Sequence, residues 1–456
     1  MKPTVISDVV ENDLCIGCGL CASLCPQSNL AMAGNQYGEY NPVEMMTCTT
    51  ECGLCLKVCP FADHTENEDM IGGRLYGTVP GIRHRRETGY YLDSYVGYSE
   101  RHRSTSASGG MATWLLEALL TGGVVDHIIC VAPTGGPERL FSFQILSAPD
   151  DVRSGAGSAY YPVEMSDVIR HIIKVPGRYA ITGIPCFIKA VRLAQQRNGT
   201  LRERIVITVG LVCGQMKGRN FTEYVAALVG VRGKVTGVRY RGKSPDQPAS
   251  NYHYTFMTQG GEQKKIFWNE GIAEAWTNRW FTPNACNYCD DVFAECADVT
   301  FMDAWLPEYS RESGGTSLVL VRSAFVQRMI GGGKDLSLHS IPVEKVVQSQ
   351  AGVLAVKRRH LAHRLYLDHV KGVTVPKKRV DPERSKNPFL RQEVVLKERM
   401  RKLSRENWIT GDHDGESFRQ TMQPDLRRLQ RSNRVSRVIT LPFRIIRKAM
   451  QGYRHE

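Results

Sequence analysis

The sequence lacks the features of a membrane-spanning or secreted protein. No apolar run in its 456 residues approaches the length that crosses a bilayer. Residues Met1 to Val10 lack the charged, apolar and small-residue order of a signal peptide. We therefore expect a cytoplasmic protein in a reducing compartment, where cysteines more often bind metals or react than form disulfides.

The sequence also lacks a basic body of the kind that binds nucleic acid. Its net charge is +13, but residues 371–456 hold 22 Lys or Arg against 10 Asp or Glu and so contribute +12 of that total. Aromatic residues are not interleaved with basic ones in the body. We expect no nucleic-acid partner, and we expect the basic tail to face an acidic protein surface, anionic lipid or solvent.

Cysteine, in contrast, is plentiful at the N-terminus. Two blocks there each end in Cys-Pro, namely Cys15-x2-Cys18-x2-Cys21-x3-Cys25-Pro26 and Cys48-x3-Cys52-x2-Cys55-x3-Cys59-Pro60. This arrangement is typical of two [4Fe-4S] clusters, because three thiolates on a tight loop bind one cube and the fourth thiolate reaches the other. The expected ligand sets are Cys15, Cys18, Cys21 and Cys59 for one cluster, and Cys48, Cys52, Cys55 and Cys25 for the other.

Two details of these blocks bear on that prediction. Gly17, Gly19 and Gly53 suit the loops, because glycine adopts left-handed dihedral angles and lets backbone amides approach sulfide. The second block departs from the usual spacing, since three residues rather than two separate its first two cysteines. A zinc module or a disulfide knot is the alternative, but zinc usually takes ligands in two pairs rather than in runs of four. The pattern therefore favours a chain that moves electrons.

Strand and helix patterns alternate after the cysteine blocks. Residues 124–132, 179–183 and 205–212 have strand patterns, whereas 108–120, 166–174 and 187–198 have helical spacing. This alternation predicts a mixed or parallel α/β sheet, and strands without helices over 235–267 predict an antiparallel subdomain. The fold class is thus α+β and α/β: a ferredoxin-like double-cluster module at 1–65, a linker at 66–89, a mixed-sheet body at 90–375 and a basic helical tail at 376–456.

Two interpretations of the end of the tail stay open. Residues 435–450 interleave apolar residues with arginine and lysine, as a helix at a membrane surface does. A helix docked on the body or on a second protein chain is the alternative, and Pro442 interrupts the periodicity. The inner face of a membrane is therefore one open location for a cytoplasmic protein of this kind.

A second group of cysteines lies in the predicted body. Cys186 and Cys213 each follow a predicted strand, and Cys286-x2-Cys289 lies in a polar loop. Because strand ends of an α/β sheet face one crevice, these four thiols are candidate ligands of a third cubane. Buried free cysteines packed in a core are the alternative. Cys296 is a reserve ligand, and Cys130, inside an apolar strand, is expected to be core packing.

Several short motifs in the body resemble one family. They are Ser106-Ala-Ser-Gly-Gly110, Gly157-Ser-Ala-Tyr160, Thr182-Gly-Ile-Pro-Cys186, Val212-Cys-Gly-Gln215, Cys286-Asn-Tyr-Cys289-Asp290 and Gly314-Gly-Thr-Ser317. Together with the cysteine blocks, they resemble the family of coenzyme F420 hydrogenase and dehydrogenase beta subunits, whose relatives include 7-hydroxymethyl chlorophyll a reductase and divinyl chlorophyllide reductase. The resemblance extends to about residue 325. Where the family has Gly-Asp after the cysteine pair, this chain has Met302-Asp303.

The resemblance implies that the body binds FAD beside a cubane. The residues it points to are Ser106, Ser108, Gly109, Gly110, Ser158, Tyr160, Thr182, Gly183 and Pro185. From the residues themselves, the Gly109-Gly110 turn that opens a helix is a reasonable pyrophosphate seat. No Gly-x-Gly-x-x-Gly follows a strand, so the usual dinucleotide fingerprint gives no support.

The sequence thus predicts an iron–sulfur flavoprotein oxidoreductase. A reduced ferredoxin or another low-potential donor is expected to supply electrons, which pass through the clusters and FAD to a small organic acceptor. A non-catalytic electron-transfer subunit of a larger redox complex is the alternative. The catalytic residues are not identified by the sequence: Asp290, Asp303 and His253 are candidate proton donors, each with a structural role as its alternative.

Overall fold

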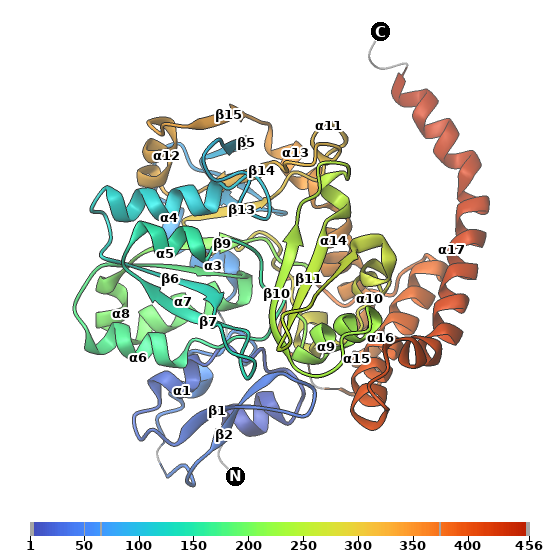
Figure 1. Ribbon diagram of the computed structural model, residues 1–456, viewed down its shortest axis with the longest axis horizontal. Coiled ribbons are helices and arrows are strands. Elements are labelled where there is room, and N and C mark those ends of the chain that lie inside the picture. The colour runs from blue at the N-terminus through green and yellow to red at the C-terminus, as the bar shows by residue number, and fades with distance from the viewer. Residues whose placement is uncertain (1–3, 50, 64–65, 374, 453–456) are drawn as a thin grey trace.

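Helices flank an eight-stranded sheet at the centre of the protein (Figure 1). The computed structural model describes residues 4–49, 51–63, 66–373 and 375–452, and side chains are described outside 440–452. The strand order is β15-β5-β14-β13-β9-β8-β6-β7. The strands are β5 (Asp93–Ser99), β6 (His127–Pro133), β7 (Phe141–Leu146), β8 (Tyr179–Gly183), β9 (Ile205–Leu211), β13 (Val299–Asp303), β14 (Ser317–Val321) and β15 (Leu336–Ser340).

Five of these strands point the same way, which gives the sheet one shared carboxyl edge. β6, β8, β9 and β13 pair in parallel, and β5 has the same direction because β14 is antiparallel to both β13 and β5. β7 and β15 are antiparallel to their neighbours. The expected mixed α/β sheet is therefore confirmed, and its carboxyl edge collects the loops that follow β5, β8, β9 and β13.

The alternation of side chains divides the core between two faces of the sheet. On one face, apolar residues such as Ile128, Val209 and Val319 pack against α4 (Met111–Thr121), with α5 (Pro149–Ser154) and α12 (Ala324–Gly331) beside it. On the other face, Ile129 and Ile181 pack against α6 (Ser166–Lys174), α7 (Pro185–Arg197) and α8 (Gly199–Arg204). α13 (Val343–Ser349) and α14 (Ala351–Ala355) extend this second layer under β5 and β14.

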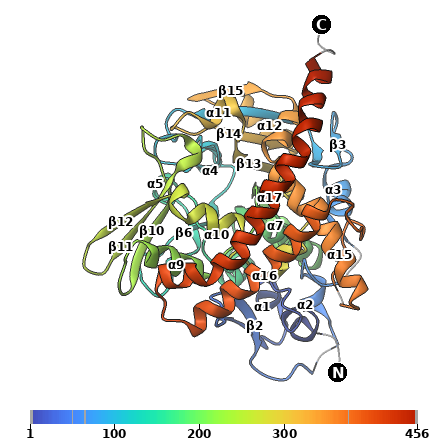
Figure 2. The ribbon, with the colours of Figure 1, turned by 90° about the vertical axis from the view of Figure 1, so that its right-hand side faces the viewer.

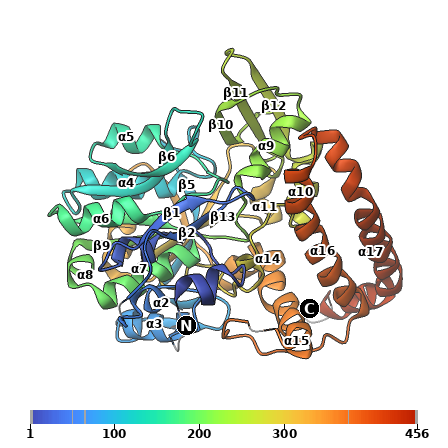
Figure 3. The same cartoon turned by 90° about the horizontal axis from the view of Figure 1, so that it is seen from below.

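The N-terminal module lies against α6 and α7 (Figure 3). It consists of η1 (Ile6–Val10), α1 (Leu20–Leu24), the antiparallel pair β1 (Leu30–Gly34) and β2 (Tyr40–Glu44), and α2 (Leu54–Lys57). The amide of Met165, just before α6, donates to the carbonyl of Cys18 over 2.9 Å. The module is thus attached to the body beside its cysteine loops.

The stretch 66–89, which we expected to be a linker, carries regular structure instead. It contains α3 (Glu68–Tyr76) and β3 (Arg83–Arg85), which pairs with β4 (Gly89–Tyr91). Ile71 and Tyr76 are buried, and the Tyr76 hydroxyl donates to the carbonyl of Cys296 over 2.9 Å. The glycines and charges of this stretch suggested a loop, but buried contacts to the body hold it in place.

A three-stranded antiparallel sheet forms the predicted subdomain. Its strands are β10 (Val235–Gly242), β11 (His253–Thr258) and β12 (Gln263–Phe267). It shares an aromatic core with α9 (Arg219–Leu228) and α10 (Ile272–Thr277). The short helices η2 (Ala249–Asn251), η3 (Trp268–Glu270), η4 (Asn284–Asn287) and α11 (Pro307–Ser310) connect these elements to the body.

The C-terminal region is helical, as predicted, and most of it is docked. It contains η5 (Val356–His360), α15 (Leu361–Val370), α16 (Pro388–Thr410) and α17 (Gly415–Gly452), the last two lying side by side in Figures 2 and 3. Trp408 and Phe418 are buried in the aromatic core of the subdomain. Arg405 pairs with Asp13 of the N-terminal module over 2.7 Å and with Glu39 over 2.9 Å.

The last part of α17 extends away from the body (Figures 1 and 2). Val435, Val438 and Ile439 are exposed there. The other apolar residues of the predicted amphipathic segment, Phe443, Ile445 and Ile446, lie outside the residues whose side chains are described. Among the described residues, none of the helices combines the length and the apolar character needed to cross a bilayer.

Candidate redox centres

The first predicted ligand set comes together in the N-terminal module. Burial raises the pKa of Cys21, and neighbouring thiols raise it further. These neighbours include Cys15, Cys18 and Cys59, the other members of the set. Since like charges act over short distances, the four sulfurs lie within electrostatic reach of one another. Gly17 and Gly19 have φ angles of 69° and 83°, as expected of glycines in these loops.

The second predicted set is more open to solvent. Burial raises the pKa of Cys55, and the thiols of Cys52 and Cys48 raise it further. Cys48 and Cys52 are exposed, whereas Cys55 is half-buried. Cys25, the fourth predicted ligand, is half-buried at the end of α1. Cys55 also raises the pKa of Cys21, so the two sets are neighbours.

Backbone amides point at the sulfurs of this module. The amide of Gly17 donates to Sγ of Cys15 over 3.3 Å. Amide hydrogen bonds also lower the pKa of Cys59 against the larger effect of its burial. Hydrogen bonds of this kind tune iron–sulfur clusters, since they favour the thiolate over the thiol. The residues present therefore fit two cubanes.

The four predicted body cysteines converge at the carboxyl edge of the sheet. Cys186 opens α7 directly after β8, Cys213 follows β9, and Cys286 and Cys289 lie in and after η4. Burial raises the pKa of Cys186 first, and the other three thiols raise it further. Residues from three distant stretches of sequence thus form one group of thiols, because β8 and β9 are adjacent parallel strands.

A buried lysine compensates this group. Nζ of Lys357 donates to Sγ of Cys289 over 2.9 Å and to the carbonyl of Asp291 over 2.6 Å. Lys357 is 3% exposed, and although burial opposes its charge, the thiols of Cys289 and Cys213 raise its pKa. It lies in η5, a π-helical turn, and such turns are frequent at functional sites. The group therefore fits an anionic cluster, since a cation is already placed beside it.

The thiols do not form a site for a single metal ion. Among the described residues, no three side chains of the His, Cys, Asp or Glu types are arranged to hold one ion. A cubane places each thiolate on a different iron atom, so its ligands need not meet at one point.

The two remaining cysteines lie apart from this group. Cys296 is buried beside Ile71, Ile188 and Leu193, and its pKa is raised by burial and then by nearby carboxylates rather than by other thiols. Cys130 is buried in β6, where burial alone raises its pKa to about 12. Its position agrees with the predicted role in core packing.

The predicted FAD residues fall into separate groups along the carboxyl edge. Ser106 to Gly110 follow β5, and Thr182, Gly183 and Pro185 lie between β8 and α7. Three strands separate β5 from β8, so the groups are roughly 19 Å apart and only an elongated ligand can touch both. Ser158 is half-buried, and Tyr160 packs on Trp276 at 4.7 Å between ring centroids.

The expected role of Gly109 as an amide donor to pyrophosphate needs correction. Its N–H already donates to Oγ of Ser317 over 3.1 Å, and a Cβ at Gly109 would lie 2.6 Å from the carbonyl of Gly97. Gly110 has a φ angle of 78° at the start of α4, which has no side-chain cap. Close packing of backbone therefore explains the glycine pair.

Cations gather next to this loop. Nζ of Lys243 donates to the carbonyls of Ser108 and Gly314 over 2.8 and 2.6 Å. Burial and then the charges of Arg103 and Arg241 lower the pKa of Lys243 to about 8, against a smaller opposing effect of Asp303. An uncapped helix beside several cations fits an anionic group such as a pyrophosphate.

The three candidate proton donors have structural partners. Asp303 accepts two hydrogen bonds from Arg241 over 2.9 and 2.8 Å. Burial would raise the pKa of Asp290, but Arg379 and two buried lysines outweigh it, so this pKa is lowered and the carboxylate stays charged. Burial lowers the pKa of His253 to about 4, with Lys265 and Arg239 adding to the effect.

Sequence reasoning missed Asp291, which follows the Cys-x2-Cys-Asp motif. Burial, and then the carboxylates of Glu295 and Glu68, raise its pKa to about 7. Its Oδ1 is buried without a hydrogen-bond partner among the described residues. Nothing in the local sequence distinguished it from Asp290, because the difference comes from partners distant in the chain.

Comparison with known proteins identifies the family. Two models of the coenzyme F420 hydrogenase/dehydrogenase beta subunits match the body, the N-terminal one over residues 94–170 and the C-terminal one over residues 177–340. The chain belongs to this family. A 4Fe-4S dicluster domain model matches residues 7–74, which agrees with the cysteine blocks.

Individual relatives match part of the chain. One component of the F(420)H(2) dehydrogenase of Methanosarcina mazei, named as one of its subunits, is 22% identical over 218 residues, which are 46% of this chain and 56% of that protein. The coenzyme F420-dependent sulfite reductase of Methanocaldococcus jannaschii is 24% identical over 194 residues, 42% of this chain and 26% of the relative. The chain thus spans about half of the first relative and a quarter of the second.

A solved structure is also similar. A chain of the F420-reducing [NiFe] hydrogenase complex from Methanosarcina barkeri superimposes with a TM-score of 0.48 at 15% identity. The superposition covers 65% of this chain and 99% of that chain.

Proposed function

We propose that this chain is an iron–sulfur, FAD-dependent oxidoreductase that takes electrons from reduced ferredoxin or another low-potential donor and delivers them to a small organic acceptor. The observation that carries this proposal is the convergence of Cys186, Cys213, Cys286 and Cys289 at the carboxyl edge, with Lys357 against them. Its iron–sulfur and oxidoreductase character agrees with the family and with the dicluster domain.

Each group of residues has a defined task in this proposal. The cysteines of the module and of the body would hold the clusters that conduct electrons. Arg103 and Lys243 would hold the pyrophosphate of FAD beside the Ser106–Gly110 loop. When bound, FAD supplies the change from single electrons to hydride transfer. The relatives named above act with F420, so a deazaflavin is the first acceptor to assay.

Metal and flavin analysis of two cysteine variants tests the proposal. Chain that is purified and reconstituted without oxygen should bind about 12 irons and one FAD, and dithionite should bleach its absorbance. Cys213→Ser should lose about a third of the iron. Cys130→Ser is the matched control, because Cys130 is buried in a strand away from the other thiols, and it should keep all of the iron.

The possible results separate the parts of the proposal. Equal iron in Cys213→Ser and Cys130→Ser would refute the body cluster. Iron without any flavin would refute the flavoprotein assignment and leave an iron–sulfur protein.

A non-catalytic subunit is the second candidate function. It is supported by the M. mazei relative, which is named as one of the subunits of a dehydrogenase. Turnover of a small acceptor by the chain alone, with reduced ferredoxin as donor, decides between the two. Turnover supports the enzyme, whereas flavin and cluster reduction without turnover supports the non-catalytic role.

A further inference from the structure

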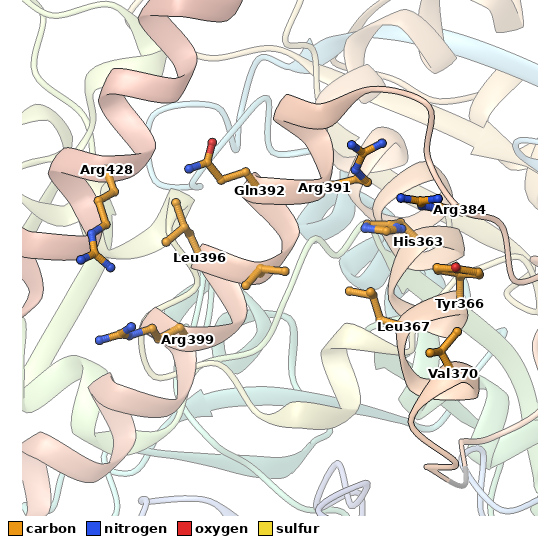
Figure 4. Close-up of a pocket in the computed structure, with 11 residues that line it drawn as sticks. His363, Tyr366, Leu367, Val370, Arg384, Arg391, Gln392, Leu396, Arg399 and Arg428 are labelled. Atoms are coloured by element: carbon orange, nitrogen blue, oxygen red, sulfur yellow. The ribbon is translucent and has the colours of Figure 1, made fainter.

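A groove between α15 and α16 lies outside the residues matched by the family models, which end at residue 340 (Figure 4). Its volume is about 1010 Å³, which is the size of a small-molecule site. The lining residues are His363, Tyr366, Leu367, Val370, Arg384, Arg391, Gln392, Val395, Leu396, Arg399 and Arg428. Neither the clusters nor the FAD residues use this groove.

The groove combines an apolar surface with arginines. Leu367 and Leu396 contribute to the apolar part, and Val370 and Val395 are 65% and 52% exposed within it. Exposed apolar side chains that adjoin each other in a concave surface are typical of a binding site. The apolar surface and the charges thus call for a ligand that has both characters.

The arginines at the two ends of the groove differ in their partners. Arg399 and Arg428 share the carboxylate of Asp425, at 2.9 and 3.7 Å. Arg391 donates to the carbonyl of Ser385 over 3.0 Å, and Arg384 has no ion-pair partner among the described residues. The end of the groove with Arg384 and Arg391 therefore carries uncompensated positive charge.

His363 lies at that same end, beside Arg384 in Figure 4. It is 2% exposed, and its Nδ1 is buried without a hydrogen-bond partner among the described residues. Burial, together with Arg391 and Arg384, lowers its pKa, which keeps the imidazole neutral. A neutral imidazole offers one hydrogen-bond donor and one acceptor, and buried polar atoms normally have partners.

We propose that this groove binds an amphipathic organic anion, a carboxylate or phosphate group on an apolar chain, with its anionic group held by Arg384, Arg391 and His363. The guanidinium groups match the planar or tetrahedral oxygens of such an anion and can bind two of them at once. The apolar chain lies along Leu367, Val395 and Leu396.

Calorimetric titration of the reconstituted full-length chain tests this proposal. The probes are decyl phosphate, decanoate, decanol and inorganic phosphate. Decyl phosphate or decanoate should bind in a saturable way, and at least tenfold more tightly than decanol or inorganic phosphate. The tighter of the two amphipathic anions identifies the natural head group as a phosphate or a carboxylate.

Three variants locate the binding. Arg384→Gln with Arg391→Gln should weaken it at least tenfold, and Val395→Asp, a change at an exposed position, should do the same by repelling the anion and removing apolar contact. Arg431→Gln with Arg434→Gln removes the same charge from exposed positions of α17 outside the groove and should leave binding unchanged. Circular dichroism confirms that each variant is folded.

Three results would overturn the proposal: no saturable binding of either anion, equal binding of decanol, or equal losses in the groove variants and the α17 control. The last of these would show that net charge alone attracts the probes. Iron and flavin contents are measured separately, so they report on the proposed function without affecting this test.

Discussion

Lys357 places a positive charge where electrons are expected to pass, and its removal has a direct electrostatic consequence. Lys357→Met keeps the length of the side chain but removes the ammonium group that donates to Cys289. Loss of a buried cation disfavours the reduced, more negative cluster, so the potential of the body cluster should become more negative by on the order of 100 mV. Redox titration followed by electron paramagnetic resonance measures the shift. Lys357→Arg should retain most of the wild-type potential, and an unshifted Lys357→Met would contradict this role.

Arg379 compensates several buried carboxylates at once. It lies 3.3 Å from Glu68 of α3, 3.3 Å from Asp290 and 2.6 Å from Glu295. Arg379→Met would leave buried carboxylates without this partner, which typically costs about 3–5 kcal/mol, so the free energy of unfolding should fall by that amount. Urea unfolding measures it, with Arg358→Met, which removes a more exposed cation 3.6 Å from Glu295, as the comparison. Similar losses of less than about 1 kcal/mol in both variants would show that the network is weak.

His253 gives the protein a pH dependence with a definite sign. Its folded pKa of about 4 lies below the usual histidine value of 6.5, because it is buried near Lys265 and Arg239. Between these values the unfolded chain binds the proton and the folded chain does not, so stability due to this group falls as the pH falls from 6.5 toward 4. His253→Asn should therefore lose less stability than the wild type between about pH 7.5 and pH 5.5. Thermal unfolding at both pH values measures the difference, and parallel losses would contradict it.

At the scale of elements, α17 has a docked half and an exposed half. Phe418, Met422 and Leu426 are buried against the subdomain, whereas Val435 and Val438 are exposed. A chain ending at residue 411 should therefore lose several kcal/mol, because each buried apolar side chain contributes about 1.5–3 kcal/mol. A chain ending at residue 437 is the control and should melt within a few degrees of the full chain. Equal melting temperatures for both truncations would show that α17 does not stabilise the body.

The elements that could be predicted from sequence are those with strong local patterns. The bounds of α6 and β8 agree with the expected 166–174 and 179–183, because a helical apolar stripe and a fully buried strand are visible in single sequence windows. The place of Cys186 and Cys213 at strand ends followed from the same patterns. α3 was missed, since only a few of its residues are buried among glycines and charges.

Features that depend on distant partners could not be read from the sequence. Lys357 belongs to a Lys-Arg-Arg run that resembles a solvated surface, yet it is buried against Cys289. Arg379 and Asp291 likewise owe their environment to residues far away in the chain. The amide of Gly109 was expected to be open, but Ser317, more than two hundred residues later, occupies it.

At the scale of the whole molecule, the candidate clusters differ in their protection from solvent. Cys48 and Cys52 are exposed, whereas Cys18, Cys21 and Cys59 are buried. Since the surrounding shell controls solvent access, brief exposure to air should first remove about a third of the iron, from the cluster of the second set. Iron analysis and electron paramagnetic resonance at timed intervals follow this loss. A single common rate for all the iron would contradict the prediction.

The ion pairs of Arg405 with Asp13 and Glu39 join the first part of the chain to one of the last. A ribosome makes the two acidic residues early and the arginine after most of the polypeptide has emerged. The nascent module therefore waits through most of translation for this partner. Whatever machinery delivers iron and sulfide during that interval meets cysteine loops that the C-terminal helices have not yet enclosed.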